Sequence, residues 1–169
     1  MSTDAGDGGT TSHAYTQVFD ADGNAAGGAQ PVDDDYDALS QQAPAITAIY
    51  GGYVAVWQAY NTDDSAFDVF SRTFDDDGNP TSCTVQVNTT GALFPANPSV
   101  AITLDGGYIV VWQGGTDSNK AIYSQRYDSC GCPDGGETLV DDGFGRPYQS
   151  GPVVSVLADG GYVRCLGDR

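Results

Sequence analysis

Two acidic segments of this 169-residue chain carry side-chain oxygens at spacings that suit a calcium ion. The segments read DADGN from residue 20 and DDDGN from residue 75, and their candidate ligands are Asp20, Asp22, Asn24, Asp75, Asp77 and Asn79. Oxygen ligands at alternate positions before a glycine resemble the first half of a calcium loop, although no glutamate follows to complete it. A hairpin turn of type I′ explains the same residues without a metal. Calcium is therefore one of two predictions for these segments, and no other cofactor is expected.

Four cysteines offer a second kind of chemistry. Cys130 and Cys132 are separated by a single glycine, which fits no zinc-ligand spacing. In an extracellular protein either of them would pair with Cys83 or Cys165, and a bond to Cys165 would fix the C-terminal strand. Cross-links between chains and buried free thiols are the other two interpretations, and the sequence does not choose among the three.

The remaining polar and aromatic residues give little sign of catalysis. His13 is the single histidine and stands in the acidic start of the chain, so neither a Ser-His-Asp triad nor a histidine-metal site is expected. Acid pairs are plentiful, but none lies in a motif that would make it a glycosidase pair. Trp57 and Trp112 suit either a sugar-binding face or the core, and their regular recurrence favours the core. Asn88 begins a match to the N-glycosylation pattern. We predict that the protein is not an enzyme.

Charge composition excludes one class of partner. The chain has 23 acidic and 6 basic residues, for a net charge of -17, and Lys120 is its single lysine. Binding to nucleic acid needs clustered lysine and arginine, so no nucleic-acid partner is expected. No segment reaches the roughly 18 apolar residues of a membrane span. Residues 1–13 are expected to be a flexible acidic leader without the features of a signal peptide.

Internal repeats position all of these residues. A first element combines a proline, alternating small and apolar residues, a Gly-Gly pair and a return strand, and its copies span 44–57, 98–112 and 152–166. A second element combines an alternating strand, a tight turn and a short strand, and its copies span 14–33, 69–88 and 122–141. We predict that each element is a β-hairpin, because Asp-Gly and Gly-Gly supply the positive φ values that tight turns need.

A first and a second element together make a four-stranded unit that is similar to a propeller blade. The sequence starts with a second element and finishes with a first element, so the third blade is expected to be built from both termini. We therefore predict an all-β fold, with three four-stranded repeats in a propeller-like arrangement, either three-bladed or β-prism-like. Closure within one chain is favoured over a ring of two chains or an exchange of hairpins between chains. Residues 14–169 would form one domain.

The phrases DGGYIVVWQGG, AIYSQRYD, DDDGNP and VQVNTT resemble a repeat found in large secreted bacterial proteins, often beside calcium-binding or adhesin-like modules. The resemblance covers about residues 14 to 166. It implies a propeller-like β-fold at an extracellular or cell-surface location, with a structural or binding task and no reaction. Two departures are the Cys130-Gly131-Cys132 turn and the replacement of the tryptophan by Leu166 in the third first element.

These features lead to one functional prediction and one alternative. We predict a non-enzymatic extracellular structural protein, the self-assembling subunit of a surface layer, fibre or tube, whose main partner is another copy of itself. The alternative is a ligand-binding module, either a lectin with a glycan partner or a calcium-dependent adhesin.

Overall fold

A computed structural model describes residues 12–34, 40–61, 66–89, 94–116, 119–140 and 149–167. These ranges form twelve β-strands and no helix, which confirms the all-β prediction. It follows that no helix long and apolar enough to cross a membrane occurs in the described part of the chain.

The strands group into two complete sheets and two isolated hairpins, all of them antiparallel. The N-terminal hairpin consists of β1 (Tyr15–Phe19) and β2 (Ala25–Pro31). The first complete sheet consists of β3 (Gln41–Ile49), β4 (Gly52–Asn61), β5 (Ala66–Asp75) and β6 (Val85–Gln86). The second complete sheet consists of β7 (Ala96–Ile102), β8 (Tyr108–Thr116), β9 (Asn119–Tyr127) and β10 (Thr138–Val140). The C-terminal hairpin consists of β11 (Ser150–Val156) and β12 (Tyr162–Gly167).

Each predicted element is indeed one hairpin. The first elements are β3 with β4, β7 with β8 and β11 with β12, and the second elements are β1 with β2, β5 with β6 and β9 with β10. In each complete sheet the two elements join through their inner strands, which pair over their whole length as β4 with β5 and β8 with β9. Of these inner strands, β4 and β8 are apolar on both faces over Tyr53–Trp57 and Tyr108–Trp112, because a layer lies on each side of them.

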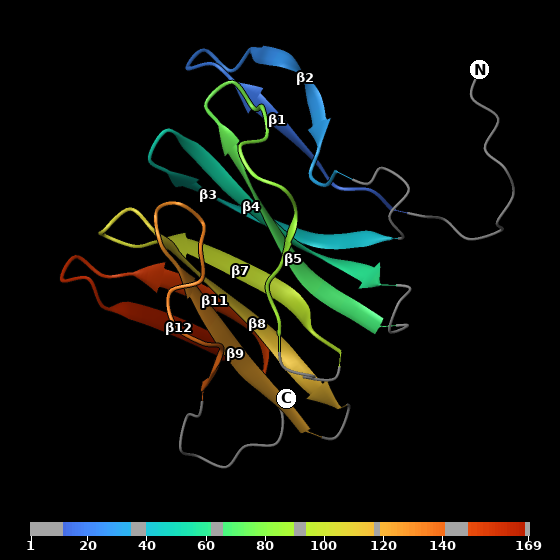
Figure 1. Ribbon diagram of the computed structural model, residues 1–169, viewed down its shortest axis with the longest axis vertical. Helices are drawn as coiled ribbons and strands as arrows, with labels where there is room; N and C mark the ends of the chain where they lie inside the picture. Colours follow the sequence, from blue (N-terminus) through green and yellow to red (C-terminus); the bar gives the residue numbers. More distant parts are fainter. Residues whose placement is uncertain are drawn as a thin grey trace, which may run out of the picture.

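The sheets follow one another in a stack, with the N-terminal hairpin at one end and the C-terminal hairpin at the other (Figure 1). A separate apolar cluster fills each of the three spaces between layers. Trp57 and Phe74 belong to the cluster under the N-terminal hairpin. Val54 and Trp112 belong to the cluster between the two complete sheets, and Val154 belongs to the one under the C-terminal hairpin. Packing therefore proceeds from each layer to the next layer in sequence.

A bulge at the start of each first element repeats with the same local chemistry. The pairing register shifts just before β3, β7 and β11 settle into regular pairing with their return strands. The residue at each bulge has a left-handed backbone, with φ of 49° at Ala43, 51° at Asn97 and 58° at Gly151. A proline follows each of them, so the bulge recurs at one position of the repeat.

The two terminal hairpins do not close a third blade within the described residues. β1 pairs with β2 and β11 pairs with β12, in two separate sheets at opposite ends of the stack. Within the described residues these strands therefore do not build a third blade, and the propeller-like arrangement is not confirmed. The physical reason is that β11 packs on β7, β8 and β9, as β7 packs on β3, β4 and β5, so each layer extends the stack instead of turning back.

The predicted leader is only partly covered by the structure. Residues 1–11 lie outside the described residues, whereas Ser12 is attached to the fold. Its carbonyl oxygen accepts a hydrogen bond from the Gln41 backbone N–H at 2.6 Å, and its hydroxyl lies 3.0 Å from that of Ser40. Ser12 therefore belongs to the folded part of the chain.

Candidate assembly interface

The acidic turns use their carboxylates to hold the backbone. In the first turn Asp20 Oδ1 accepts hydrogen bonds from the backbone N–H of Asp22 at 3.0 Å and of Asn24 at 2.8 Å. The Asn24 side-chain amide donates to Asp20 Oδ2 at 3.0 Å. The second turn repeats this pattern from Asp75 to Asn79. These hydrogen bonds, with the asparagine amide first, lower the pKa of both leading aspartates below the ordinary value of 3.8.

The third copy of the turn shows what the leading aspartate does in each of the three turns. Asp128 Oδ1 accepts hydrogen bonds from the backbone N–H of Cys130 and of Cys132, both at 2.9 Å. The leading aspartate thus makes the same contacts where no second carboxylate is present, which makes it a turn-forming residue. Among the described residues, no group of three or more histidine, cysteine, aspartate or glutamate side chains is placed to hold a metal ion.

The predicted turn type is wrong in detail. A type I′ turn needs two residues with positive φ, but in these turns only the glycine has one, with φ of 84° at Gly23, 84° at Gly78 and 78° at Gly131. Asp20 N–H donates to the Asn24 carbonyl, and Gly23 N–H donates to the Asp20 carbonyl. This is the three-residue hairpin loop in which a left-handed glycine forms a bulge.

The cysteines form no disulfide among the three whose side chains the structure describes. Cys83, Cys130 and Cys132 are exposed, and no disulfide joins any two of them. The predicted pairing of Cys83 with Cys130 or Cys132 is therefore not made, and neither are these three thiols buried. The side chain of Cys165 lies outside the described residues, so the prediction of a bond to β12 stays a prediction.

The two tryptophans belong to the core. Trp57 and Trp112 are 1% and 0% exposed, and their rings stack on Phe70 and Tyr123 at centroid distances of 6.2 Å and 6.1 Å. Burial of both indoles excludes a solvent-facing sugar platform at these positions, in agreement with the interpretation that their recurrence favours packing.

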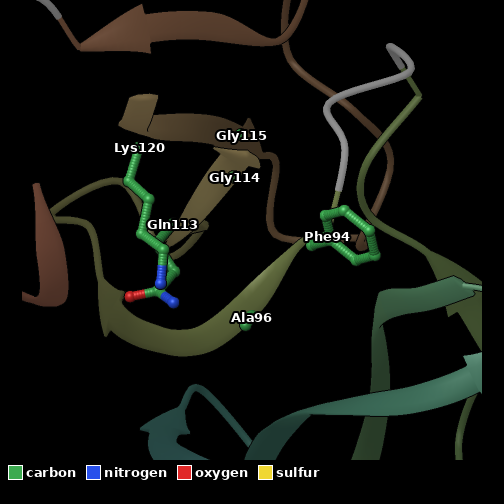
Figure 2. Close-up of a pocket in the computed structure, with 6 residues that line it drawn as sticks. All are labelled: Phe94, Ala96, Gln113, Gly114, Gly115 and Lys120. Carbon is green, nitrogen blue, oxygen red and sulfur yellow. The ribbon is translucent and has the colours of Figure 1, made fainter. Parts of the chain in front are cut away.

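A pocket of about 240 Å³ lies beside β8 and is lined by Phe94, Ala96, Gln113, Gly114, Gly115 and Lys120 (Figure 2). It is smaller than the roughly 300–1,000 Å³ of a typical small-molecule site. Its one amide is already engaged, because Gln113 Oε1 accepts a hydrogen bond from the Gly151 backbone N–H at 3.1 Å. The Gln113 side chain thus joins β8 to β11, and the pocket gives no support to a glycan site.

Buried amides are a recurrent structural feature that the sequence did not reveal. Asn88 Oδ1 accepts a hydrogen bond from the Val69 backbone N–H at 2.8 Å, and its Nδ2 donates to Asp68 at 2.7 Å. Gln41 and Gln149 make the corresponding bonds to the backbone N–H groups at the starts of the other two second elements. Because the Asn88 amide nitrogen is committed inside the fold, the match to the N-glycosylation pattern is not an accessible acceptor.

The feature that remains is at the two ends of the stack, where no strand of the described residues pairs with the outer edge of β1 or of β12. In the repeat β1 corresponds to β5, and its outer edge is the one through which β5 pairs with β4. In the same way β12 corresponds to β8, and its outer edge is the one through which β8 pairs with β9. Phe19 on β1 is 59% exposed and Tyr162 on β12 is 42% exposed. Their counterparts in the complete sheets, Phe74 and Tyr108, are 1% and 3% exposed. The terminal hairpins therefore present to solvent the residue positions that form the centre of a complete sheet.

Comparison of the chain with protein-family models, with curated proteins and with solved structures finds no match in any of the three. Repetition in the sequence was the signal that could have located Phe19 and Tyr162, since aligning the three copies places them at the aromatic positions of the inner strands.

Proposed function

We propose that this chain is a non-catalytic structural protein of a cell surface or extracellular layer, and that it assembles with copies of itself into a fibre, tube or sheet. The observation that carries the proposal is the pair of open, apolar edges at opposite ends of one stack. An exposed edge with aromatic side chains is a template for pairing with another chain.

The geometry favours a continuing assembly over a closed pair. β1 and β12 belong to different hairpins and expose different residues, so a contact between them is of the head-to-tail type. Repetition of such a contact generates a ring when the rotation per subunit closes and a filament when it does not. A structural role needs no catalytic group.

Net charge sets the conditions under which assembly is expected. At a charge of -17, copies repel one another at low ionic strength. The screening length falls from about 30 Å at 0.01 M salt to about 3 Å at 1 M salt, so added salt removes the repulsion and leaves the apolar contact. We therefore expect assembly to strengthen with salt, unlike a contact made by opposite charges.

The test is particle size as a function of salt and protein concentration. Light scattering coupled to gel filtration, followed by negative-stain microscopy, is expected to show oligomers or filaments that grow with both variables. The same samples with calcium and with a chelator test the alternative of a calcium-dependent adhesin. Dispersed monomers at every salt concentration, with or without calcium, would refute the proposal.

A further inference from the structure

We infer that β12 of one copy pairs antiparallel with β1 of a second copy, with Tyr162 opposite Phe19, so that the two terminal hairpins complete one four-stranded sheet. This inference rests on the proposed self-assembly and specifies its contact. The partner is a second copy of this chain, and the interface consists of one strand pair and the apolar face beside it.

Two complete sheets inside the chain supply the template for the register. Tyr53 pairs with Phe74 between β4 and β5, and Tyr108 pairs with Tyr127 between β8 and β9. The rings of each pair stack, with centroids 4.9 Å and 4.7 Å apart and interplanar angles of 8° and 12°. In the aligned repeats Tyr162 corresponds to Tyr53 and Tyr108. Phe19 corresponds to Phe74 and Tyr127. Joining the hairpins at the same register would bury both rings in a third stack.

Backbone directions agree with this register. Ala14 and Asp20 exchange hydrogen bonds with the β2 side, so alternation along β1 directs the backbone groups of Tyr15, Gln17 and Phe19 to its outer edge. Leu157 pairs with Gly161 on the β11 side, and alternation likewise directs the backbone of Tyr162 to the outer edge of β12. Hydrogen-bonding positions on the two edges therefore face each other when Tyr162 lies opposite Phe19.

The glycine before each tyrosine gives an independent sign of a neighbouring strand. A Cβ atom added at Gly52 would lie 1.9 Å from the Phe74 carbonyl oxygen, and one added at Gly107 would lie 2.2 Å from the Tyr127 carbonyl oxygen. At Gly161 the nearest atom would be Asp159 Oδ1, the end of a flexible side chain, at 3.1 Å. The third copy thus keeps a glycine that the described chain does not require sterically, at the position where the proposed junction would bring the Phe19 carbonyl.

The faces beside the strands match as well. Val100 on β7 and Val154 on β11 each pack on the preceding layer and are 8% and 6% exposed, whereas the matching residue on β3, Ile46, is 60% exposed. On the other end of the stack Val163 is 51% exposed, although its counterparts Val54 and Ile109 are buried. Docking of β12 on β1 brings the C-terminal hairpin of one copy over β3 of the next and covers both surfaces.

The junction differs from the internal contacts at its far end. Gln58 and Gln113, which follow the two tryptophans, accept hydrogen bonds from the backbone N–H groups of Asn97 and Gly151 in the following layer. In β12 the residue at this repeat position is Gly167, which has no side-chain amide. The junction therefore lacks the hydrogen bond from a backbone N–H group to a glutamine side chain. This makes it weaker than the contacts inside the chain and suits an assembly that responds to concentration.

The first experiment uses Gly161→Ala in the full chain, with Gly136→Ala as the matched control because an added Cβ atom there meets nothing within 4 Å. We expect Gly161→Ala to raise the concentration required for assembly at least roughly tenfold, with an unchanged circular dichroism spectrum and melting temperature of the dilute monomer. Gly136→Ala should assemble like the unmodified chain. Undiminished assembly of Gly161→Ala would overturn the inference.

The second experiment traps the register in a background in which the four native cysteines are serine. Val163 would lie opposite Val18 at a pair without backbone hydrogen bonds, where Cα atoms are about 4.5 Å apart and a disulfide fits. Mixing Val18→Cys with Val163→Cys under mild oxidation should give a covalent heterodimer, while Gln17→Cys with Val163→Cys, whose side chains point to opposite faces, should give none.

The two failures can be told apart. If the unmodified chain stays monomeric, the proposed function and the register fail together. If it assembles but Gly161→Ala assembles equally well and the Val18→Cys and Val163→Cys pair stays unlinked, the self-assembly stands and the β12-to-β1 contact is wrong.

Discussion

Replacement of Gly107 by alanine should destabilise the monomer by about 2–4 kcal/mol. The added Cβ atom would lie 2.2 Å from the Tyr127 carbonyl oxygen and 3.2 Å from two backbone atoms of Asp128. Since these are backbone atoms, the ends of β8 and β9 must separate by about 1 Å to restore normal contact. That separation lengthens the terminal hydrogen bonds, at a net ~0.5–1.5 kcal/mol each, and disrupts the Tyr108 stack, at another ~0.5–1.5 kcal/mol.

Chemical denaturation measures this loss directly. Urea unfolding of dilute protein should show a lower midpoint with an unchanged slope, and the melting temperature should fall by about 5–15 °C for a domain of this size. Gly136→Ala serves again as the control and should change the free energy of unfolding by less than ~0.5 kcal/mol. A loss below ~0.5 kcal/mol for Gly107→Ala would refute the close approach of β8 and β9 at this point.

Two further predictions concern buried polar groups. Asn88→Leu should lower the free energy of unfolding by about 2–4 kcal/mol, because it leaves the Val69 N–H without its partner and removes the hydrogen bond to buried Asp68. Thr89→Ala changes an exposed neighbour and should be nearly neutral in the same urea titration. Burial raises the pKa of Tyr108 and of Tyr127 above the ordinary value of 10.0. Folding therefore favours the protonated phenols, so stability is complete below pH 10 and falls above it. Because Tyr127 keeps its raised pKa in Tyr108→Phe, the melting temperature of this variant should still fall above pH 10, but less steeply than that of the unmodified chain; equal alkaline loss in both would contradict this cause for Tyr108.

Local structure could be predicted from sequence because the residues that determine each hairpin turn lie within that hairpin. Asp-Gly and Gly-Gly turns fix where strands reverse, and the prolines at 44, 98 and 152 mark the bulges that begin the first elements. The recurrence of Trp57 and Trp112 correctly favoured the core. Closure could not be read in this way, because it depends on the angle between successive sheets, and that angle is set by the shapes of facing side chains such as Val100 and Val154.

The acidic turns show where sequence reasoning reaches its limit. A pattern of aspartates states which oxygens are present but not which donors they face. In the structure Asp75 Oδ1 already accepts two backbone N–H bonds, and Asp128 does the same in a turn that has cysteines instead of a second acid. Only geometry shows that these carboxylates support their turns.

The identity of the two edges constrains the kind of assembly that can form. A two-fold dimer would pair β1 with β1 or β12 with β12, and either arrangement sets two copies of one edge against each other. Neither reproduces the pairing of a first element with a second element that both complete sheets share. It would also leave the other end of each stack, with Ile46 or Val163, open to solvent. A head-to-tail contact covers both ends at once and repeats a packing step that the chain already makes internally, so a ring or filament is expected, and a discrete two-fold dimer as the sole product would contradict the β12-to-β1 contact.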